Sequence, residues 1–182
     1  MSKSYIIFEC NRCEYTGTSR VAWGNLAYLV NNIKIPLNRE LGYCMGCKAL
    51  CAKERFDNDR LTSKMQNISN IISEYQSLFR TLIPSTKKSI ADENAKLNAH
   101  RALSELLTSR SSQERCLNCA SSKVIALENG YDLEYRKGFF LGVAMTGFKH
   151  PECGGEFIAR GSDISLNMRF SERLYSPYGL PL

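Results

Sequence analysis

Long apolar runs are absent from this chain of 182 residues. Its longest uncharged stretches, Val21–Ile33 and Gly138–Phe148, are well short of the roughly 20 residues that a membrane-spanning helix needs. Residues 1–9 contain an apolar run of only four residues, so the sequence predicts no secretory signal peptide. We therefore expect a cytoplasmic protein that does not enter a membrane. Cytoplasmic thiols stay reduced, and paired cysteines there more often bind metal than form disulfides; a secreted disulfide framework is the alternative.

Common catalytic motifs are also absent. The sequence contains no glycine-rich phosphate loop, no HExxH motif and no deaminase signature of the form HxE followed by PCxxC. We find no Ser-His-Asp set or clustered carboxylates at useful spacing, and only two histidines. The sequence therefore predicts a protein that is not an enzyme.

The chain has only a small excess of positive charge, and this excess is unevenly distributed along the sequence. The net charge is +6, and residues 1–53 hold seven Lys or Arg against three Asp or Glu. An excess of this size permits contact with nucleic acid or with an acidic protein surface but requires neither.

Eight residues form four pairs, each with two residues between its members. The pairs are Cys10/Cys13, Cys44/Cys47, Cys116/Cys119 and His150/Cys153. A tetrahedral zinc ion takes four Cys or His ligands, and this spacing lets one tight turn direct two of them at one ion. Proximity in the sequence groups the first two pairs around one ion and the last two around another. We expect both ions to be structural, because four protein ligands leave no position for water.

Each predicted four-ligand set resembles a zinc ribbon, in which two metal-binding turns at the tips of β-hairpins meet around one ion. The resemblance covers residues 1–52 and 116–160. The layout is also similar to uncharacterised bacterial proteins with two ribbons flanking a helical middle and a His-Pro-x-Cys-Gly-Gly turn. The resemblance to zinc ribbons implies two zinc ions and a transcription, translation or nucleic-acid setting, whereas the layout implies a bacterial protein and no particular activity. A four-cysteine set is also similar to rubredoxin, so iron with electron transfer or redox sensing is the alternative.

Composition divides the chain into three segments and predicts an α+β fold. These are an N-terminal ribbon over 1–52, a helical middle over 53–110 and a C-terminal ribbon with extra strands over 111–182. No glycine occurs between Gly46 and Gly130. Apolar residues follow a heptad spacing over 61–82, which predicts a helix that Pro84 ends or kinks, and a second helix runs over Ser89–Leu107. The two form an antiparallel hairpin, or one long kinked coiled coil that forms a homodimer through residues 61–82.

We expect an adaptor that docks on a protein or a nucleic acid. The candidate nucleic-acid contacts are Arg12, Arg20, Trp23, Lys34, Arg39 and Lys48, because basic and aromatic side chains together can hold phosphates and stack on bases. Alternatively, the aromatic residues cover the thin ribbon core. Cys51 is an alternative ligand, a redox-sensing thiol or, as we favour, a small buried residue. His100 is expected to be exposed or to cap a helix.

Overall fold

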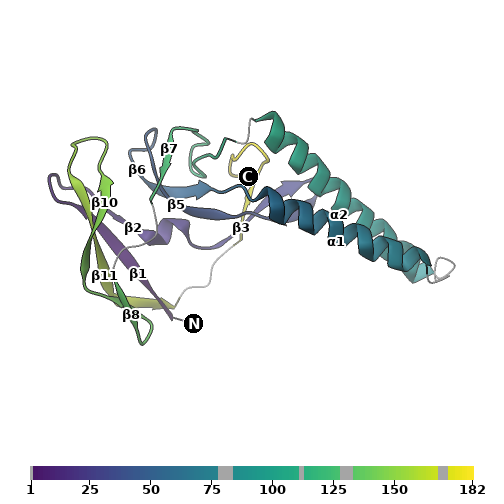
Figure 1. The fold of residues 1–182 in the computed structure, drawn as a ribbon, viewed down its shortest axis with the longest axis horizontal. Coiled ribbons are helices and arrows are strands. Elements are labelled where there is room, and N and C mark those ends of the chain that lie inside the picture. The colour runs from purple at the N-terminus through teal and green to yellow at the C-terminus, as the bar shows by residue number, and fades with distance from the viewer. Residues whose placement is uncertain (1, 78–83, 111–112, 128–132, 168–171) are drawn as a thin grey trace.

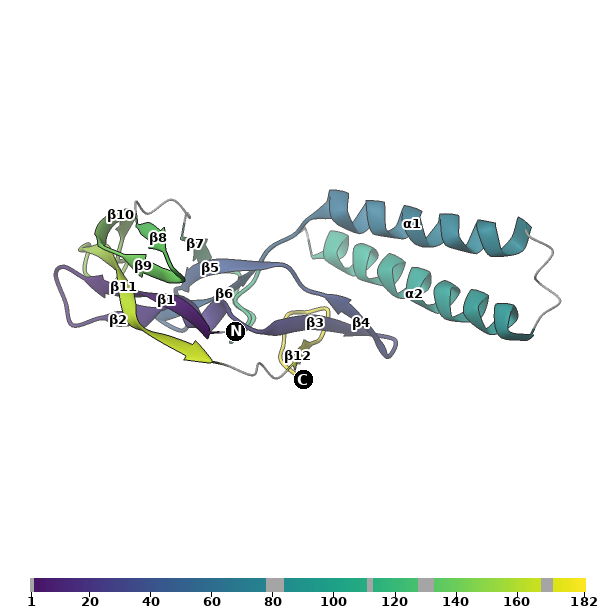
Figure 2. The same ribbon diagram turned by 90° about the horizontal axis from the view of Figure 1, so that it is seen from below.

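The computed structural model describes residues 2–77, 84–110, 113–127, 133–167 and 172–182. Figure 1 shows an elongated molecule with β-strands at one end and a pair of helices extending from the other. Figure 2 shows strands β3 (Asn25–Val30) and β4 (Ile33–Pro36) reaching from the β-rich end toward the helices. The architecture is therefore α+β, as the sequence predicts.

Two antiparallel hairpins lie side by side in the largest sheet, whose strand order is β10-β11-β1-β2. Its strands are β10 (Val143–Lys149), β11 (Glu156–Asn167), β1 (Ser2–Cys10) and β2 (Thr16–Thr18). Strand β1 pairs antiparallel with β11, and Cys10 lies opposite Phe157. The first and last thirds of the chain thus share one sheet.

Two further sheets have three strands each, and a small one has two. Strand β12 (Glu172–Tyr175) pairs parallel with β3, which pairs antiparallel with β4. Strand β5 (Arg39–Cys44) lies between β6 (Ala49–Glu54) and β7 (Val124–Ala126). The small sheet joins β8 (Glu134–Arg136) and β9 (Phe139–Leu141), and a short 3-10 helix, η1 (Ser19–Ala22), follows β2.

Every described sheet of three or more strands combines strands from both terminal segments of the chain. The core follows the same pattern, because Phe8, Tyr43 and Phe157 pack into one buried cluster from three different strands. The two ends of the chain therefore fold together as one β-body. They do not form two ribbons that are separate from each other.

The middle of the chain forms helices α1 (Asn58–Ser77) and α2 (Pro84–Ser109), which lie antiparallel and side by side in both views (Figures 1 and 2). Asp57 caps α1, because its carboxylate accepts a hydrogen bond of 2.9 Å from the backbone N–H of Arg60. Helix α2 begins at Pro84, earlier than predicted, because proline suits the first position of a helix.

The apolar face of α1 is covered by α2 of the same chain. Ile68 and Ile72 are buried against Leu97 of α2, with Met65 and Ile90 packed around them. The predicted coiled coil is therefore not supported. A homodimer through residues 61–82 stays a prediction, and residues 78–82 lie outside the described residues.

A second face of α2 packs onto the β-body. Ala99, Leu103 and Leu107 recur every fourth residue and are buried with apolar residues of β3 and β4, such as Leu26 and Ile35. Neither described helix is long and apolar enough to cross a membrane.

Candidate metal centres

The first candidate centre is formed by Cys10, Cys13, His150 and Cys153, whose ligand atoms lie within 4.8 Å of one another. The Sγ atom of Cys153 is 3.4 Å from Sγ of Cys10 and 3.5 Å from Sγ of Cys13. His150 directs Nδ1 into the cluster, 3.3 Å from Sγ of Cys13 and 3.2 Å from Sγ of Cys153. We call these four residues the first cluster.

Strand pairing brings the first cluster together from opposite ends of the chain. Cys10 is the last residue of β1 and Cys13 lies in the turn before β2, while His150 and Cys153 lie in the turn between β10 and β11. Because β1 pairs with β11, the two turns lie next to each other at the same end of the sheet.

Close backbone packing at Gly155 supports this geometry. A Cβ atom at Gly155 would lie 2.6 Å from Cβ of Arg12 and 2.7 Å from Sγ of Cys10, so only glycine fits there. Gly154 has a φ of +69°, a left-handed conformation that glycine adopts readily. Backbone N–H groups of Arg12 and Gly155 donate to Sγ of Cys10 and Cys153, at 3.5 and 3.4 Å. These donors favour the thiolate form that binds metal.

His150 is held by a buried aromatic shell. It is 3% exposed, and its ring lies 4.9 Å from the ring of Tyr15 and 5.2 Å from that of Phe157. Its Nε2 atom is 3.1 Å from the hydroxyl of Tyr43. With Nδ1 turned to the cluster, Nε2–H donates to the Tyr43 oxygen, the kind of contact that fixes a ligating histidine's tautomer and orientation. Burial, together with the neighbouring Tyr15, raises the pKa of Tyr43 to about 12, so the phenol stays protonated.

The second candidate centre, here called the second cluster, is formed by Cys44, Cys47, Cys116 and Cys119, again with ligand atoms within 4.8 Å of one another. Sγ of Cys44 is 3.6 Å from Sγ of Cys119, and Sγ of Cys47 is 3.9 Å from Sγ of Cys116. The first pair lies at the turn between β5 and β6 and the second precedes β7, which pairs with β5. The second cluster therefore also joins two turns next to paired strands.

In each cysteine turn of the second cluster, a backbone N–H two or three residues further on bonds to the first cysteine. The N–H groups of Cys47 and Asn118 each donate to the first cysteine Sγ of their turn, at 3.4 Å. The residues that follow the second cysteine, Lys48 and Ala120, have φ values of +51° and +58°. The left-handed residue turns the chain away directly after the second ligand.

Cys51 is a fifth thiol beside the second cluster. It is 0% exposed and packs with Cys44 and Cys116, which agrees with the interpretation as a small buried residue. A hydrogen bond from its thiol lowers the pKa of Cys116 to about 4, because it stabilises the thiolate. Cys51 therefore lies outside the four-ligand set but supports one of its members.

The segments that precede and follow the helical pair lie next to each other beside the second cluster. The N–H of Glu54 donates to the carbonyl of Arg115 at 2.8 Å, and Lys53 forms an isolated β-bridge with Cys116. The buried carboxylate of Glu54 accepts hydrogen bonds of 2.6 and 3.4 Å from Arg110, which directly follows α2. Since the two ends of the helical pair are fastened together, the turns on either side of it meet.

The grouping of the pairs predicted from proximity in the sequence is wrong. Cys10 and Cys13 share a cluster with His150 and Cys153, and the two middle pairs share the other. The pairs are therefore nested, the first with the fourth and the second with the third. The physical reason is that β1 pairs with β11 and the helical pair closes on itself, and both pairings override distance along the chain.

Both clusters fit a tetrahedral metal. Zinc–sulfur bonds of about 2.3 Å in a tetrahedron place sulfurs roughly 3.8 Å apart. The second cluster has separations of 3.6 and 3.9 Å, and the first has slightly shorter ones of 3.4 and 3.5 Å. Thiolate and imidazole are the ligands that zinc prefers. The protein thus has two possible four-ligand metal sites.

Two of the six predicted nucleic-acid contacts lie beside the first cluster. The guanidinium of Arg12 donates to the carbonyl oxygen of Cys153 at 3.2 Å. Lys48 forms an ion pair of 2.9 Å with Glu152, in the same turn. Both side chains therefore hold the turn of the first cluster as well as facing solvent.

The other four predicted contacts lie away from the metal ligands. Arg20 stacks over the ring of Tyr5 at 5.3 Å, and Trp23 packs edge-on against the same ring at 6.2 Å. Arg39 donates to backbone carbonyls on both sides of Trp23, while Lys34, on β4, pairs with a glutamate of β12. The structure thus brings Arg20, Trp23 and Arg39 together around η1 but leaves Lys34 apart from them.

Sequence reasoning missed Tyr43 as a partner of His150. Its position directly before Cys44 gives no sign that it serves the other cluster. Only the alternation of side chains along a strand suggests that the residue before a ligand faces the opposite way. Comparison with protein-family models, curated proteins and solved structures gave no match.

Proposed function

We propose that this protein is a non-enzymatic, zinc-binding adaptor in which two structural zinc ions fasten a composite β-body. The observation that carries this proposal is that each cluster contains four side-chain ligands. A tetrahedral ion bound by four protein ligands has no position left for water or substrate, which is the arrangement of structural sites.

The energetic role of the ions follows from the size of the sheets. Strands β2, β7, β8 and β9 have only three residues each, so each contributes few ladder hydrogen bonds. A structural zinc ion supplies about 10–16 kcal/mol of binding energy that is coupled to folding. Loss of both ions would therefore remove more than the whole net stability of about 5–15 kcal/mol that a typical domain has.

Metal analysis combined with unfolding tests the proposal. We expect two zinc ions per chain in untagged protein, and loss of β-sheet circular dichroism and of the cooperative melting transition after chelation. Restoration by added zinc would separate metal loss from chelator damage. If chelation removes both ions and leaves the melting transition unchanged, the ions are not structural.

The second cluster supports one alternative, a rubredoxin-like iron site for electron transfer or redox sensing, because all four of its ligands are thiolates. The first cluster, with His150, suits zinc better. Colour separates the two cases: iron held by four thiolates is red when oxidised, and a zinc protein is colourless. A reversible colour change on reduction would favour electron transfer over the adaptor role.

The interactions that the predicted nucleic-acid contacts make within the protein favour a protein partner over nucleic acid. Lys34 and Lys48 are already in ion pairs, and Arg39 is turned onto backbone carbonyls. Nucleic-acid binding through phosphate contacts strengthens steeply as salt is lowered. We expect no retention of DNA or RNA in a mobility assay even at low salt, and retention that falls with added salt would reverse this choice.

A further inference from the structure

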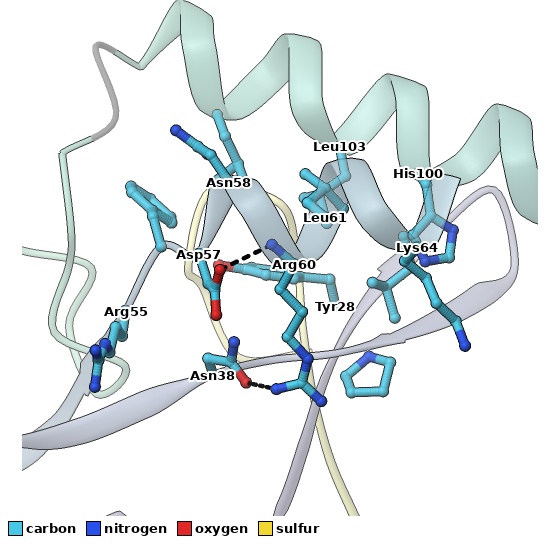
Figure 3. Close-up of a pocket in the computed structure, with 14 residues that line it drawn as sticks. Tyr28, Asn38, Arg55, Asp57, Asn58, Arg60, Leu61, Lys64, His100 and Leu103 are labelled. Carbon is cyan, nitrogen blue, oxygen red and sulfur yellow. Dashed lines mark hydrogen bonds between the residues drawn. The ribbon is translucent and has the colours of Figure 1, made fainter. Parts of the chain in front are cut away.

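A pocket lies where the helical pair meets the β-body, away from both metal clusters. Its volume is about 230 Å³, and its walls come from the start of α1, the C-terminal half of α2 and the strands β3 and β4. Figure 3 shows the residues that line it. The volume is somewhat below the roughly 300–1,000 Å³ of pockets for drug-sized ligands, so it suits a smaller molecule.

His100 is the most informative residue of this pocket. The sequence-based expectation of an exposed or capping histidine is wrong, because His100 is only 6% exposed. Its Nδ1–H donates to the carbonyl of Lys96, one turn earlier in α2, at 2.8 Å. Its Nε2 atom has no hydrogen-bond partner among the residues that the structure describes. Figure 3 shows the ring extending from α2 into the pocket. The ring therefore forms part of the pocket wall and can contact a bound molecule.

Basic side chains also line the pocket. Arg60 and Lys64 are one helical turn apart, so both lie on the same face of α1. Arg60 is positioned by a hydrogen bond of 2.7 Å from Nη1 to Oδ1 of Asn38 (Figure 3). Arg55 also lines the pocket. These groups are the ones that recognise an anion.

The floor of the pocket is apolar. It is formed by Tyr28, Ile35, Leu103 and Leu107, all of which are buried. The Tyr28 hydroxyl is already bonded to the carboxylate of Glu54, so its ring offers an apolar face. A ligand that fills the pocket must therefore combine an apolar body with an anionic group.

The carboxylate of Asp57 restricts how much negative charge the anionic group of the ligand can carry. This carboxylate lines the pocket and already caps α1 by accepting the N–H of Arg60. A dianionic phosphate at the helix terminus would compete with this cap and be repelled by it. A monoanion held by Lys64 and the guanidinium of Arg60 avoids the cap and still meets two donors.

We propose that this pocket binds a small organic carboxylate whose single ring rests on the apolar floor beside His100 and whose carboxylate is held by the basic side chains of α1. The site makes no use of the metal clusters, so it goes beyond the adaptor role.

Nuclear magnetic resonance of the zinc-loaded full chain tests the proposal. The sequence has only two histidines, and His150 belongs to the first cluster, so the ring signals of His100 are readily told apart. We expect benzoate to shift the His100 ring signals with a dissociation constant of about 1 mM or lower, a range accessible to very small ligands. Acetate has no ring and benzylamine has the opposite charge, so both should bind at least about tenfold more weakly.

Matched variants assign the effect to the pocket. His100→Gln should weaken benzoate binding roughly threefold or more, because it removes a ring of the pocket wall against which the ligand packs. Since this change could also disturb packing, Lys64→Gln at the exposed rim gives a second test, with an expected loss of roughly two- to fivefold. Lys88→Gln, on an exposed part of α2 outside the pocket, should have no effect.

Three results would overturn the proposal. The first is the absence of any shift of the His100 signals at about ten times the expected dissociation constant. The second is equal binding of benzoate and benzylamine. The third is a loss of affinity in Lys88→Gln as large as that in Lys64→Gln.

Discussion

Replacing two cysteines at a time separates the nested arrangement of ligands from a sequential one. In Cys10→Ser/Cys153→Ser both changes fall on the first cluster, so the second should keep its ion and the protein should hold one zinc per chain. In Cys10→Ser/Cys44→Ser each cluster loses one ligand. A sequential grouping predicts the reverse of both results.

The expected loss of zinc affinity can be estimated by dividing the binding energy equally among the four ligands. If about 12 kcal/mol is divided over four ligands, one lost thiolate costs about 3 kcal/mol, or roughly 150-fold in affinity. A chelator chosen to be tenfold weaker than the intact sites should then strip both ions from Cys10→Ser/Cys44→Ser. The same chelator should remove only one from Cys10→Ser/Cys153→Ser.

Native mass spectrometry after dialysis against the chelator counts the ions directly. Cys51→Ser is the matched control, because Cys51 is buried beside the second cluster without belonging to its four ligands, and this variant should keep two ions. The reasoning fails if Cys10→Ser/Cys44→Ser retains one ion while Cys10→Ser/Cys153→Ser retains none.

Three further substitutions test how the clusters and the helical pair are held. Gly155→Ala places a Cβ atom 2.7 Å from Sγ of Cys10, so the first cluster alone should lose zinc; a count of two ions would contradict the close approach. Tyr43→Phe removes the hydroxyl bonded to the ligating histidine and should weaken zinc in the first cluster about tenfold in chelator competition, with unchanged affinity in the second. Arg110→Met leaves the carboxylate of Glu54 buried without its cation and should lower the free energy of unfolding in urea by about 3–5 kcal/mol, whereas a loss below about 1 kcal/mol would mean that the pair is not buried in solution.

The metal ligands could be predicted from the sequence because their spacing is a local property. Two ligands separated by two residues need only one turn of backbone, and the turn at Cys44 shows the expected N–H bond to sulfur. No comparable local pattern indicates which turns meet. Closing a longer loop costs only about 0.6 kcal/mol for each doubling of its length, so proximity along the chain is a weak guide.

Helix positions were also predictable, but their partners were not. The spacing of Ile68 and Ile72 marks an apolar stripe, and a stripe does not identify the surface that covers it. In the structure Leu97 of the same chain covers it. The burial of His100 was equally hidden, because it depends on how α2 lies across β3 and β4.

The two clusters are physically connected through β5, although no residue belongs to both. Successive side chains of a strand point to opposite faces, so Tyr43 reaches the histidine of the first cluster while Cys44 belongs to the second. An ion bound in the second cluster would therefore fix the end of β5, and with it the hydroxyl next to His150. The reverse influence is weaker, because Cys44 and Cys47 are also held by the ladder between β5 and β6. The helical pair also closes the loop that connects the two cysteine turns of the second cluster. Both features favour a folding order in which the second cluster forms before the first.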